Sequence, residues 1–382
     1  MKLASTDVVV IGGGVIGAAS AFSLAKAGVR VTLVERRGLG HEASGANMGL
    51  VTLFTTYSHL EPDTGPFYHL ARASADGYLS LVDEVGLDIE YERSGGIVFA
   101  DTEEKLRGIR RAYEGYHAHG VPVEWLGPEG VRAYEPAFCH EGILGGVFCP
   151  LNGYVNPMLA TRAYGLGARR QGANLLLGTE VHGITCEHGQ VRAVQTSAGD
   201  IPCAFVVNAA GAWAAEIGAM VGLKIPISPA RGQMLVTEPA PRIIHRVVSG
   251  GEPAARQTRR GNVLIGSMVE NVGYDKHVTP GVLGHFARGI LPLFPKLRGL
   301  QVIRTWAGLR PASPDHSPII QRLEEPKGFC LATGHSKRGM IQAGGTGQLI
   351  TELILGKSPF LPLAPFSLER FHLGPATDPV LR

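Results

Sequence analysis

The chain has 382 residues, a length that corresponds to two or three domains. Its 52 glycines are about twice the usual share of roughly 7%, but 45% of the residues are hydrophobic, 18% are charged and no Gly-X-Y period occurs, which excludes a disordered or collagen-like chain. The formal net charge is +3 and adjacent basic residues occur only in pairs, which argues against binding to nucleic acid or to an anionic membrane.

The five cysteines are scattered and contain no CxxC pair, so we expect neither a disulfide framework nor a metal site, and a reducing compartment fits. No stretch of about 18 apolar residues occurs, and the first residues lack the apolar core of a signal peptide. We therefore expect a cytoplasmic protein without a transmembrane segment.

The first 35 residues carry the most informative pattern. Residues 8–11 are apolar and mostly β-branched, which predicts a buried parallel strand. A glycine-rich turn follows, then small helix-forming residues up to position 27, a glycine suited to the helix end, and a second strand-like run over 29–34. This order of strand, glycine turn, helix and strand is typical of a dinucleotide-binding unit.

Three glycines and one acid of this unit have distinct expected roles. Gly12 permits the tight turn, Gly14 allows the backbone to approach a pyrophosphate, and Gly17 allows close packing of helix and strand. Helix-start N–H groups bind the phosphates. Glu35 is placed to accept hydrogen bonds from a ribose and to repel a 2′-phosphate, which disfavours NADP. The spacing alone does not distinguish FAD from NAD.

The rest of the chain shows coarser signals of a mixed α/β protein. Helices are predicted over 67–86, 102–120, 157–171 and 347–355. Strands are predicted over 95–100, 174–177, 205–207, 234–237 and 262–266, the last two as short strands of a second sheet. No internal repeat occurs, and we expect two interleaved domains.

Several strings, in this order, resemble the FAD-dependent amino-acid oxidase family, which includes glycine oxidase, sarcosine oxidase, D-amino acid oxidase and the β-type subunits of proline, hydroxyproline and opine dehydrogenases. The resemblance covers nearly the whole chain. The strings are the glycine fingerprint, Ala43–Gly49, Gly153–Pro157, Val207–Trp213, Pro229–Met234, Trp306–Pro311 and Ala332–Met340, followed by Gly347.

The resemblance implies a Rossmann-type FAD-binding domain, in residues 1–84, 149–222 and 305–382, interleaved with an antiparallel-sheet substrate domain in 85–148 and 223–304. It implies noncovalent FAD, because Pro311 stands where sarcosine-oxidase-like members carry a cysteine that links the flavin. The residues expected to bind FAD are Gly12, Gly14, Val15, Ile16, Gly17, Glu35, Arg36, Ser44, Gly45, Ala46, Asn47, Met48, Gly49, Val181, Ala210, Gly211, Trp213, Gly308, Arg310, Gly334, His335, Lys337, Arg338, Gly339 and Met340.

Arg310 is the residue that the resemblance assigns to the substrate carboxylate, and a guanidinium suits a bidentate grip on that group. Lys337 is a second candidate for substrate binding, and with Arg338 it favours an acidic substrate; the alternative is that both charges are solvated. The resemblance also implies that a loop over 344–347, leading into a helix from about Gln348, faces the flavin. We assign no general base and no metal ligand.

The expected reaction is oxidation of the C–N bond of a small amino acid, of the glycine, sarcosine, D-amino acid or D-hydroxyproline type, by hydride transfer to flavin N5, giving an imino acid. Sarcosine-oxidase-like members activate dioxygen with a lysine on the strand that matches 263–265, and this sequence has none there. An alternative is therefore a catalytic β-type subunit that passes electrons to partner dehydrogenase subunits. A homo-oligomer, or a non-catalytic FAD-binding protein, is the remaining alternative.

Overall fold

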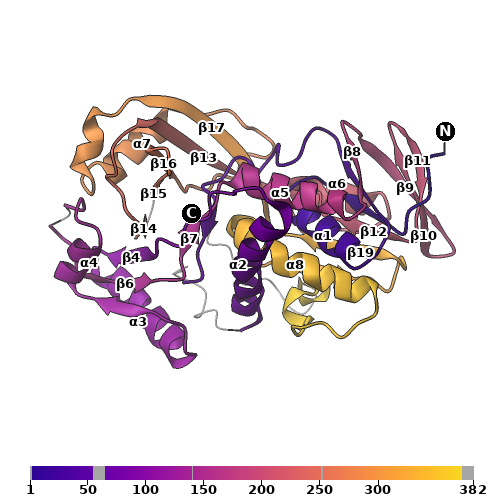
Figure 1. The fold of residues 1–382 in the computed structure, drawn as a ribbon, viewed down its shortest axis with the longest axis horizontal. Helices are drawn as coiled ribbons and strands as arrows, with labels where there is room; N and C mark the ends of the chain where they lie inside the picture. The colour runs from indigo at the N-terminus through magenta and orange to yellow at the C-terminus, as the bar shows by residue number, and fades with distance from the viewer. Residues whose placement is uncertain (1, 55–64, 140, 251–252, 372–382) are drawn as a thin grey trace.

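The computed structural model describes residues 2–54, 65–139, 141–250 and 253–371. Two large sheets lie in the two halves of an elongated molecule, with helices packed between and against them (Figure 1). None of the helices in these described ranges is long and apolar enough to cross a membrane.

The first sheet has six strands in the order β18-β19-β12-β1-β2-β8, and all but β18 are parallel to their neighbours. In chain order the strands are β1 (Val8–Ile11), β2 (Val31–Glu35), β8 (Asn174–Leu177), β12 (Phe205–Asn208), β18 (Ile319–Arg322) and β19 (Phe329–Thr333). The sequence predicted strands at four of these places. Because strands buried on both faces are apolar throughout, β1 reads as an uninterrupted apolar run.

The two faces of β1 belong to different cores. Val8 and Val10 pack in one cluster with residues of α1 (Val15–Lys26) and α8 (Gly339–Ile354). Val9 packs in another cluster, with residues of the three-stranded antiparallel sheet β11-β10-β9. The parallel sheet therefore separates two cores, one of which it shares with α1 and α8.

The eight strands of the second sheet have the order β17-β13-β16-β15-β14-β4-β6-β5, with every neighbouring pair antiparallel except β14 and β4. The strands are β4 (Gly96–Ala100), β5 (Glu124–Leu126), β6 (Gly145–Cys149), β13 (Ser228–Pro239), β14 (Val247–Ser249), β15 (Ala254–Gln257), β16 (Asn262–Gly266) and β17 (Val302–Ala312). This confirms the predicted fold class, a Rossmann-type sheet combined with a largely antiparallel one.

The short strand predicted over 234–237 is wrong in extent. It is the middle of β13, which pairs with β17 from Ser228 to Thr237 and is lengthened by that ladder. β17 also runs across the domain limit predicted at 304/305, and the domain limits themselves stay a prediction.

The remaining elements complete the two halves. The helices are α2 (Pro66–Val85), α3 (Glu103–Ala118), α4 (Pro128–Tyr134), α5 (Pro157–Arg170), α6 (Ala214–Ala219) and α7 (Pro280–Ile290). The short strands are β3 (Leu50–Val51), β7 (Gly153–Tyr154), β9 (Val181–Glu187), β10 (Gln190–Thr196) and β11 (Gly199–Pro202). The 3-10 turns are η1 (Gly211–Trp213), η2 (Pro295–Gly299), η3 (Ser336–Arg338), η4 (Ala364–Phe366) and η5 (Leu368–Phe371).

The loop predicted over 344–347 is wrong: these residues lie inside α8, which begins at Gly339 rather than near Gln348. Their glycines serve close packing between helices. A Cβ on Gly345 would lie 2.6 Å from the Leu70 carbonyl oxygen, and one on Gly347 would lie 2.6 Å from that of Ala19. The residues expected to form a loop are therefore a helical segment packed against α1 and α2.

We predict opposite effects from the same substitution at two helical glycines. Gly347→Ala inserts a methyl against the backbone of α1 and is expected to lower the free energy of unfolding by about 1–3 kcal/mol. Gly77→Ala, on α2 with open space around the added carbon, is expected to raise it by about 0.5–1 kcal/mol. Urea unfolding of both variants measures the difference; a stabilised Gly347→Ala protein would show that the helices are not held at this distance.

Candidate functional site

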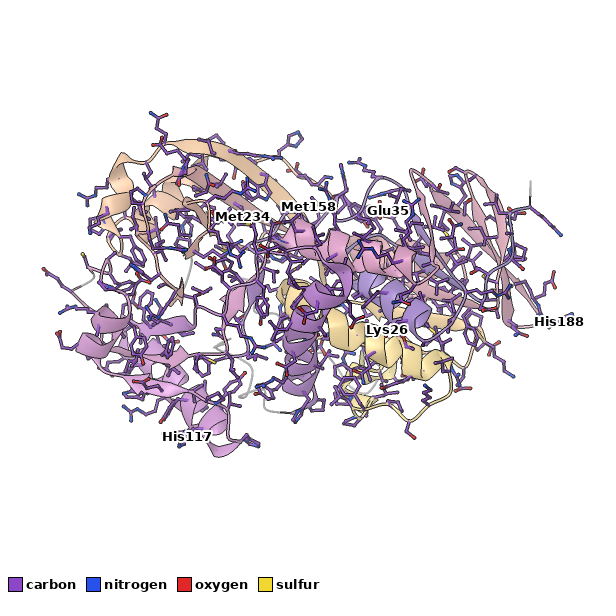
Figure 2. All side chains as sticks on the ribbon, in the orientation of Figure 1. Lys26, Glu35, His117, Met158, His188 and Met234 are labelled. Atoms are coloured by element: carbon purple, nitrogen blue, oxygen red, sulfur yellow. The ribbon has the colours of Figure 1, made fainter. Side chains whose placement is uncertain are left out.

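One large cavity, about 2020 Å³ with its mouth included, lies where the two sheets meet. Glu35 of the six-stranded sheet and Met234 of the eight-stranded sheet both line it, and Figure 2 shows them over different halves of the molecule. Most residues predicted to bind FAD line this cavity. They are Gly12, Gly14, Val15, Ile16, Glu35, Arg36, Ser44, Ala46, Asn47, Met48, Val181, Ala210, Gly211, Trp213, Gly308, Arg310, His335, Lys337, Arg338, Gly339 and Met340.

Four of the predicted glycines are not part of the cavity wall. A Cβ on Gly17 would overlap the carbonyl oxygen of Gly12, and one on Gly45 that of Gly40. Gly49 and Gly334 have φ of +73° and +76°, which other residues rarely adopt. These glycines shape the segments that carry the lining residues, and the structure gives them no place facing the cavity.

The glycine turn after β1 is fixed by two side chains. Gly12 has φ of +113°, as its tight turn requires. The Gly13 N–H donates to Glu35 Oε2 at 2.7 Å, and the Val15 N–H donates to Ser44 Oγ at 2.9 Å. Glu35 thus holds the turn as well as lining the cavity, and Ser44 satisfies one of the N–H groups expected to meet a phosphate.

At one end of the cavity Trp213 contacts two flat side chains. The Arg36 guanidinium carbon lies 4.1 Å from the centroid of the indole ring, and the Tyr274 ring stacks on it at 5.5 Å and 24°. The Tyr274 hydroxyl donates to the Ala212 carbonyl oxygen at 3.2 Å, and Lys276 forms an ion pair with Glu42 at 3.0 Å. No motif connects Tyr274 with Trp213, so the sequence alone assigns Tyr274 no role.

A loop over residues 43–49 forms one wall and is held from two strands. Trp306 of β17 donates its indole N–H to the Ala46 carbonyl oxygen at 3.1 Å. Arg256 of β15 donates to the Met48 carbonyl oxygen, and its guanidinium carbon lies 4.2 Å from the Tyr154 ring centroid. Arg256 is 3% exposed, and burial lowers its pKa to about 10. No local pattern points to Arg256, because its partners Met48 and Tyr154 lie far away in the chain.

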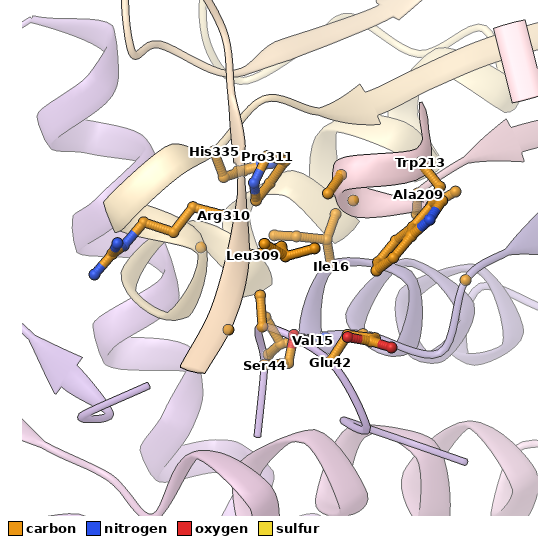
Figure 3. A pocket seen from close by; sticks show the side chains of 18 of the residues that line it. Val15, Ile16, Glu42, Ser44, Ala209, Trp213, Leu309, Arg310, Pro311 and His335 are labelled. Carbon is orange, nitrogen blue, oxygen red and sulfur yellow. Dashed lines mark hydrogen bonds between the residues drawn. The ribbon is translucent and has the colours of Figure 1, made fainter. Parts of the chain in front are cut away.

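Arg310 lies on β17, on the opposite side of the cavity from Trp213. Its side chain points away from Trp213 (Figure 3). Its Nη1 donates to the Met268 carbonyl oxygen at 2.8 Å. Gly232, on the neighbouring strand β13, leaves room for the guanidinium, which a Cβ at that position would overlap. Ser267, just before Met268, lines the same region with φ of +96°, an uncommon conformation for a residue with a side chain.

His335, in the turn before α8, is buried and neutral. Burial lowers its pKa to about 3. The His335 Nε2 lies 2.9 Å from the Thr346 hydroxyl oxygen, which lies 2.8 Å from the Gln342 carbonyl oxygen. The His335 Nδ1 is buried without a partner in the described structure, in a side chain that lines the cavity.

A family description, DAO: FAD dependent oxidoreductase, matches residues 7–353. The chain belongs to this family. Among its relatives, glycine oxidase of Pseudomonas aeruginosa is 34% identical, with 95% of this chain and 98% of that protein covered. Hydrogen cyanide synthase subunit HcnC of the same organism is 32% identical, with 97% of each chain covered. The crystal structure of glycine oxidase from Geobacillus kaustophilus matches with a TM-score of 0.90 at 30% identity, covering 97% of this chain and all of that one.

The chain is thus an FAD-dependent enzyme of the amino-acid oxidase type, as the resemblance implied. The cavity suits this cofactor. The glycine turn and the start of α1 are suited to the pyrophosphate, and Glu35 to the adenosine ribose. The buried Nδ1 of His335 lacks a hydrogen-bond partner in the described structure, and FAD offers ribityl hydroxyls that can donate or accept.

We predict that Gly232→Ala displaces the Arg310 guanidinium while leaving the fold intact, because the added carbon meets the end of a flexible side chain rather than backbone. Arg310 is predicted to bind the substrate carboxylate, so loss of this charge-assisted contact is expected to raise KM for the amino-acid substrate roughly 10-fold to 100-fold. Steady-state kinetics measures this, with FAD content as the check on folding and Gly281→Ala, which has open space, as the matched control. An unchanged KM would show that the position of the Arg310 guanidinium over Gly232 is not required for substrate binding.

A second prediction concerns pH. The pKa of His335 is about 3 in the folded protein and 6.5 in the unfolded chain, so the unfolded chain binds more protons between these pH values. The stability that neutral His335 contributes is therefore fully present above pH 6.5 and is lost as the pH falls below it. The holoenzyme is expected to lose about 2 kcal/mol from this residue between pH 7 and pH 5. His335→Asn removes that contribution, so its pH dependence in urea unfolding should be shallower by this amount. Equal slopes for the two proteins would contradict the assignment.

Proposed function

We propose that this enzyme oxidises the C–N bond of a small amino acid whose carboxylate binds Arg310, and that it releases an imino acid. The observation that carries the proposal is the placement of Arg310. Its guanidinium is held by the Met268 carbonyl oxygen, given room by Gly232, and lines the cavity suited to FAD at the side away from Trp213. The glycine oxidase relatives favour a substrate of the glycine type.

In this proposal the protein acts mainly by placement. The Arg310 guanidinium holds the carboxylate through two N–H donors, which orients the bond between the α-carbon and nitrogen. Met48, Met234 and Leu309 line the cavity and exclude water from that bond. FAD, when bound, would supply the two-electron acceptor for the α-hydrogen. The amine must be neutral, because its lone pair forms the C=N bond, and no described residue needs to remove a proton from carbon.

We further propose that FAD is held without a covalent bond. Among the described residues that line the cavity none is a cysteine. Pro311 lies in the cavity wall, at the position where sarcosine-oxidase-like members of the family carry the cysteine that links the flavin. The five cysteines have no disulfide in the described structure, and the three buried ones have raised pKa values because burial disfavours the thiolate. FAD should therefore be released on unfolding in urea.

A second candidate function is that of a catalytic subunit that passes electrons to partner subunits. It is favoured by one relative, which is named as a subunit of hydrogen cyanide synthase. It is also favoured by the apolar stretch Val263–Ile265 of β16, which offers no lysine to activate dioxygen. Fast turnover with an artificial dye but slow peroxide formation would favour this candidate over an oxidase that works alone.

The direct test of the proposal is Arg310→Met. The variant retains the aliphatic part of the side chain but loses the charge, so KM for amino acids is expected to rise at least about 100-fold while FAD stays bound. Arg298→Met, on the exposed turn η2, serves as the matched control and should behave like the wild type. An unchanged KM in the Arg310 variant would remove this residue from substrate binding.

A further inference from the structure

The segment between β16 and α7 links the eight-stranded sheet to the wall of the large cavity. We call its residues 268–279 the strap; they lie outside the helices and the strands. Both ends of the strap are bound to β13, and its tip, around Tyr274, contacts the cavity wall at Trp213. Trp213 belongs to η1, which follows β12 of the six-stranded sheet. The strap therefore connects parts of the molecule that belong to different sheets.

The first end of the strap is held by a buried arginine. Arg231 of β13 is 3% exposed and donates through Nε and Nη2 to the two carboxylate oxygens of Glu270, at 2.9 and 3.0 Å. The backbones of the same two residues exchange hydrogen bonds of 2.8 and 2.9 Å. The Arg231 Nη1 also donates to Asp275 Oδ2 at 2.6 Å. Because a bidentate pair is strong and fixes geometry, this end of the strap is firmly placed.

The second end is held by Gln233, which is fully buried two residues further along β13. Its Nε2 donates to Glu270 at 2.6 Å and to the Thr279 hydroxyl at 3.0 Å. Its Oε1 accepts from the Thr279 N–H at 2.9 Å. One buried amide thus joins both ends, and the residues between them form a loop that is closed at β13.

The tip of the strap is held by weaker contacts. Tyr274 is 45% exposed; its ring stacks on Trp213 with the centroids 5.5 Å apart, and its hydroxyl donates to the Ala212 carbonyl oxygen at 3.2 Å. Lys276 forms a partly exposed ion pair with Glu42 at 3.0 Å. Trp213, Ala212 and Glu42 line the large cavity, whereas Tyr274 and Lys276 are not among the described lining residues. The tip therefore supports this wall from outside.

The supported wall belongs to the end of the cavity that is suited to the adenosine of FAD. Glu35, which is suited to the ribose, and its neighbour Arg36 both line this end. The Arg36 guanidinium carbon lies 4.1 Å from the centroid of the Trp213 ring, the same ring on which Tyr274 stacks. A displacement of the tip would therefore reach residues expected to meet the cofactor.

We propose that the strap retains FAD: while its tip contacts Trp213 the wall around the adenosine is fixed, and FAD leaves when the tip lifts. Arg231 and Gln233 are positioning residues, because they contact the strap and are not among the described residues that line the cavity. The tip opens before the ends do, since a partly exposed stack and ion pair are weaker than buried charge-assisted hydrogen bonds. This inference concerns the cofactor and does not depend on which amine is oxidised.

The first test removes the contact at the tip. Tyr274→Ala loses the stack and the hydrogen bond, so the FAD dissociation constant of the holoenzyme is expected to rise roughly 3-fold to 30-fold. Flavin fluorescence after dilution of the holoenzyme measures the release. Tyr113→Ala is the matched control, because this tyrosine of α3 also stacks on a ring, that of His117 at 5.4 Å and 18°, and does not line the cavity. The control should retain FAD as the wild type does.

A double-mutant cycle tests whether Arg231 acts through the strap. Arg231→Met removes the pairs with Glu270 and Asp275 and is expected to weaken FAD binding at least as much as Tyr274→Ala does. Adding Tyr274→Ala to Arg231→Met should then weaken FAD binding by less than about twofold more, because the tip is already released. Arg231→Lys, which keeps the charge but not the bidentate geometry, takes the place of Arg231→Met if that variant does not fold.

Three results would overturn the inference. The first is that Tyr274→Ala retains FAD as well as the wild type. The second is that Tyr113→Ala loses FAD as readily as Tyr274→Ala, since retention would then follow general stability. The third is that the effects of the Arg231 and Tyr274 substitutions multiply, since Arg231 would then support the fold independently of the tip.

Discussion

The structure depends on backbones that approach more closely than side chains would allow. Gly17 meets the carbonyl of Gly12 and Gly347 meets that of Ala19, so the first and last long helices lie against each other over the parallel sheet. Because a packed interior transmits small displacements, these contacts set where the turn before α8 and the glycine turn after β1 sit. Both turns form the wall of the cavity suited to FAD. The high glycine content is thus tied to one large, flat cofactor.

The cavity has two ends of opposite character. Around Trp213 it is flat and carries acids, with Tyr274 and the Lys276–Glu42 pair tying the segment after β16 to the FAD-binding half. Around Arg310 it is cationic and is built from β13 and β17. The same segment supplies the Met268 carbonyl that orients Arg310, so one stretch of chain connects the two ends. His335 lines the same cavity and is neutral, because burial lowers its pKa to about 3. It therefore adds no positive charge to the wall of the cavity suited to FAD.

Local patterns were sufficient for the parts of the site that lie close together in the chain. The run from Val8 to Glu35 predicted its strands, turn and helix because the binding of a pyrophosphate is encoded within one βαβ unit. Arg256 and Tyr274 were not assigned a role from the sequence, because each contacts a segment distant in the chain and only the fold brings them together. The prediction of a loop over 344–347 was wrong because it followed the low helix propensity of glycine. In the folded protein these glycines lie in a helix, since only a residue without a side chain fits against the backbones at Leu70 and Ala19.

The central claim is that a small amino acid, held through its carboxylate by Arg310, gives up its α-hydrogen to FAD in this cavity. Anaerobic mixing of the holoenzyme with small amino acids, followed by flavin absorbance, tests it most directly. We predict saturable bleaching by at least one α-amino acid and none by the corresponding amine that lacks the carboxylate. Absence of bleaching with every amino acid, or equal bleaching by the amine without a carboxylate, would contradict the claim.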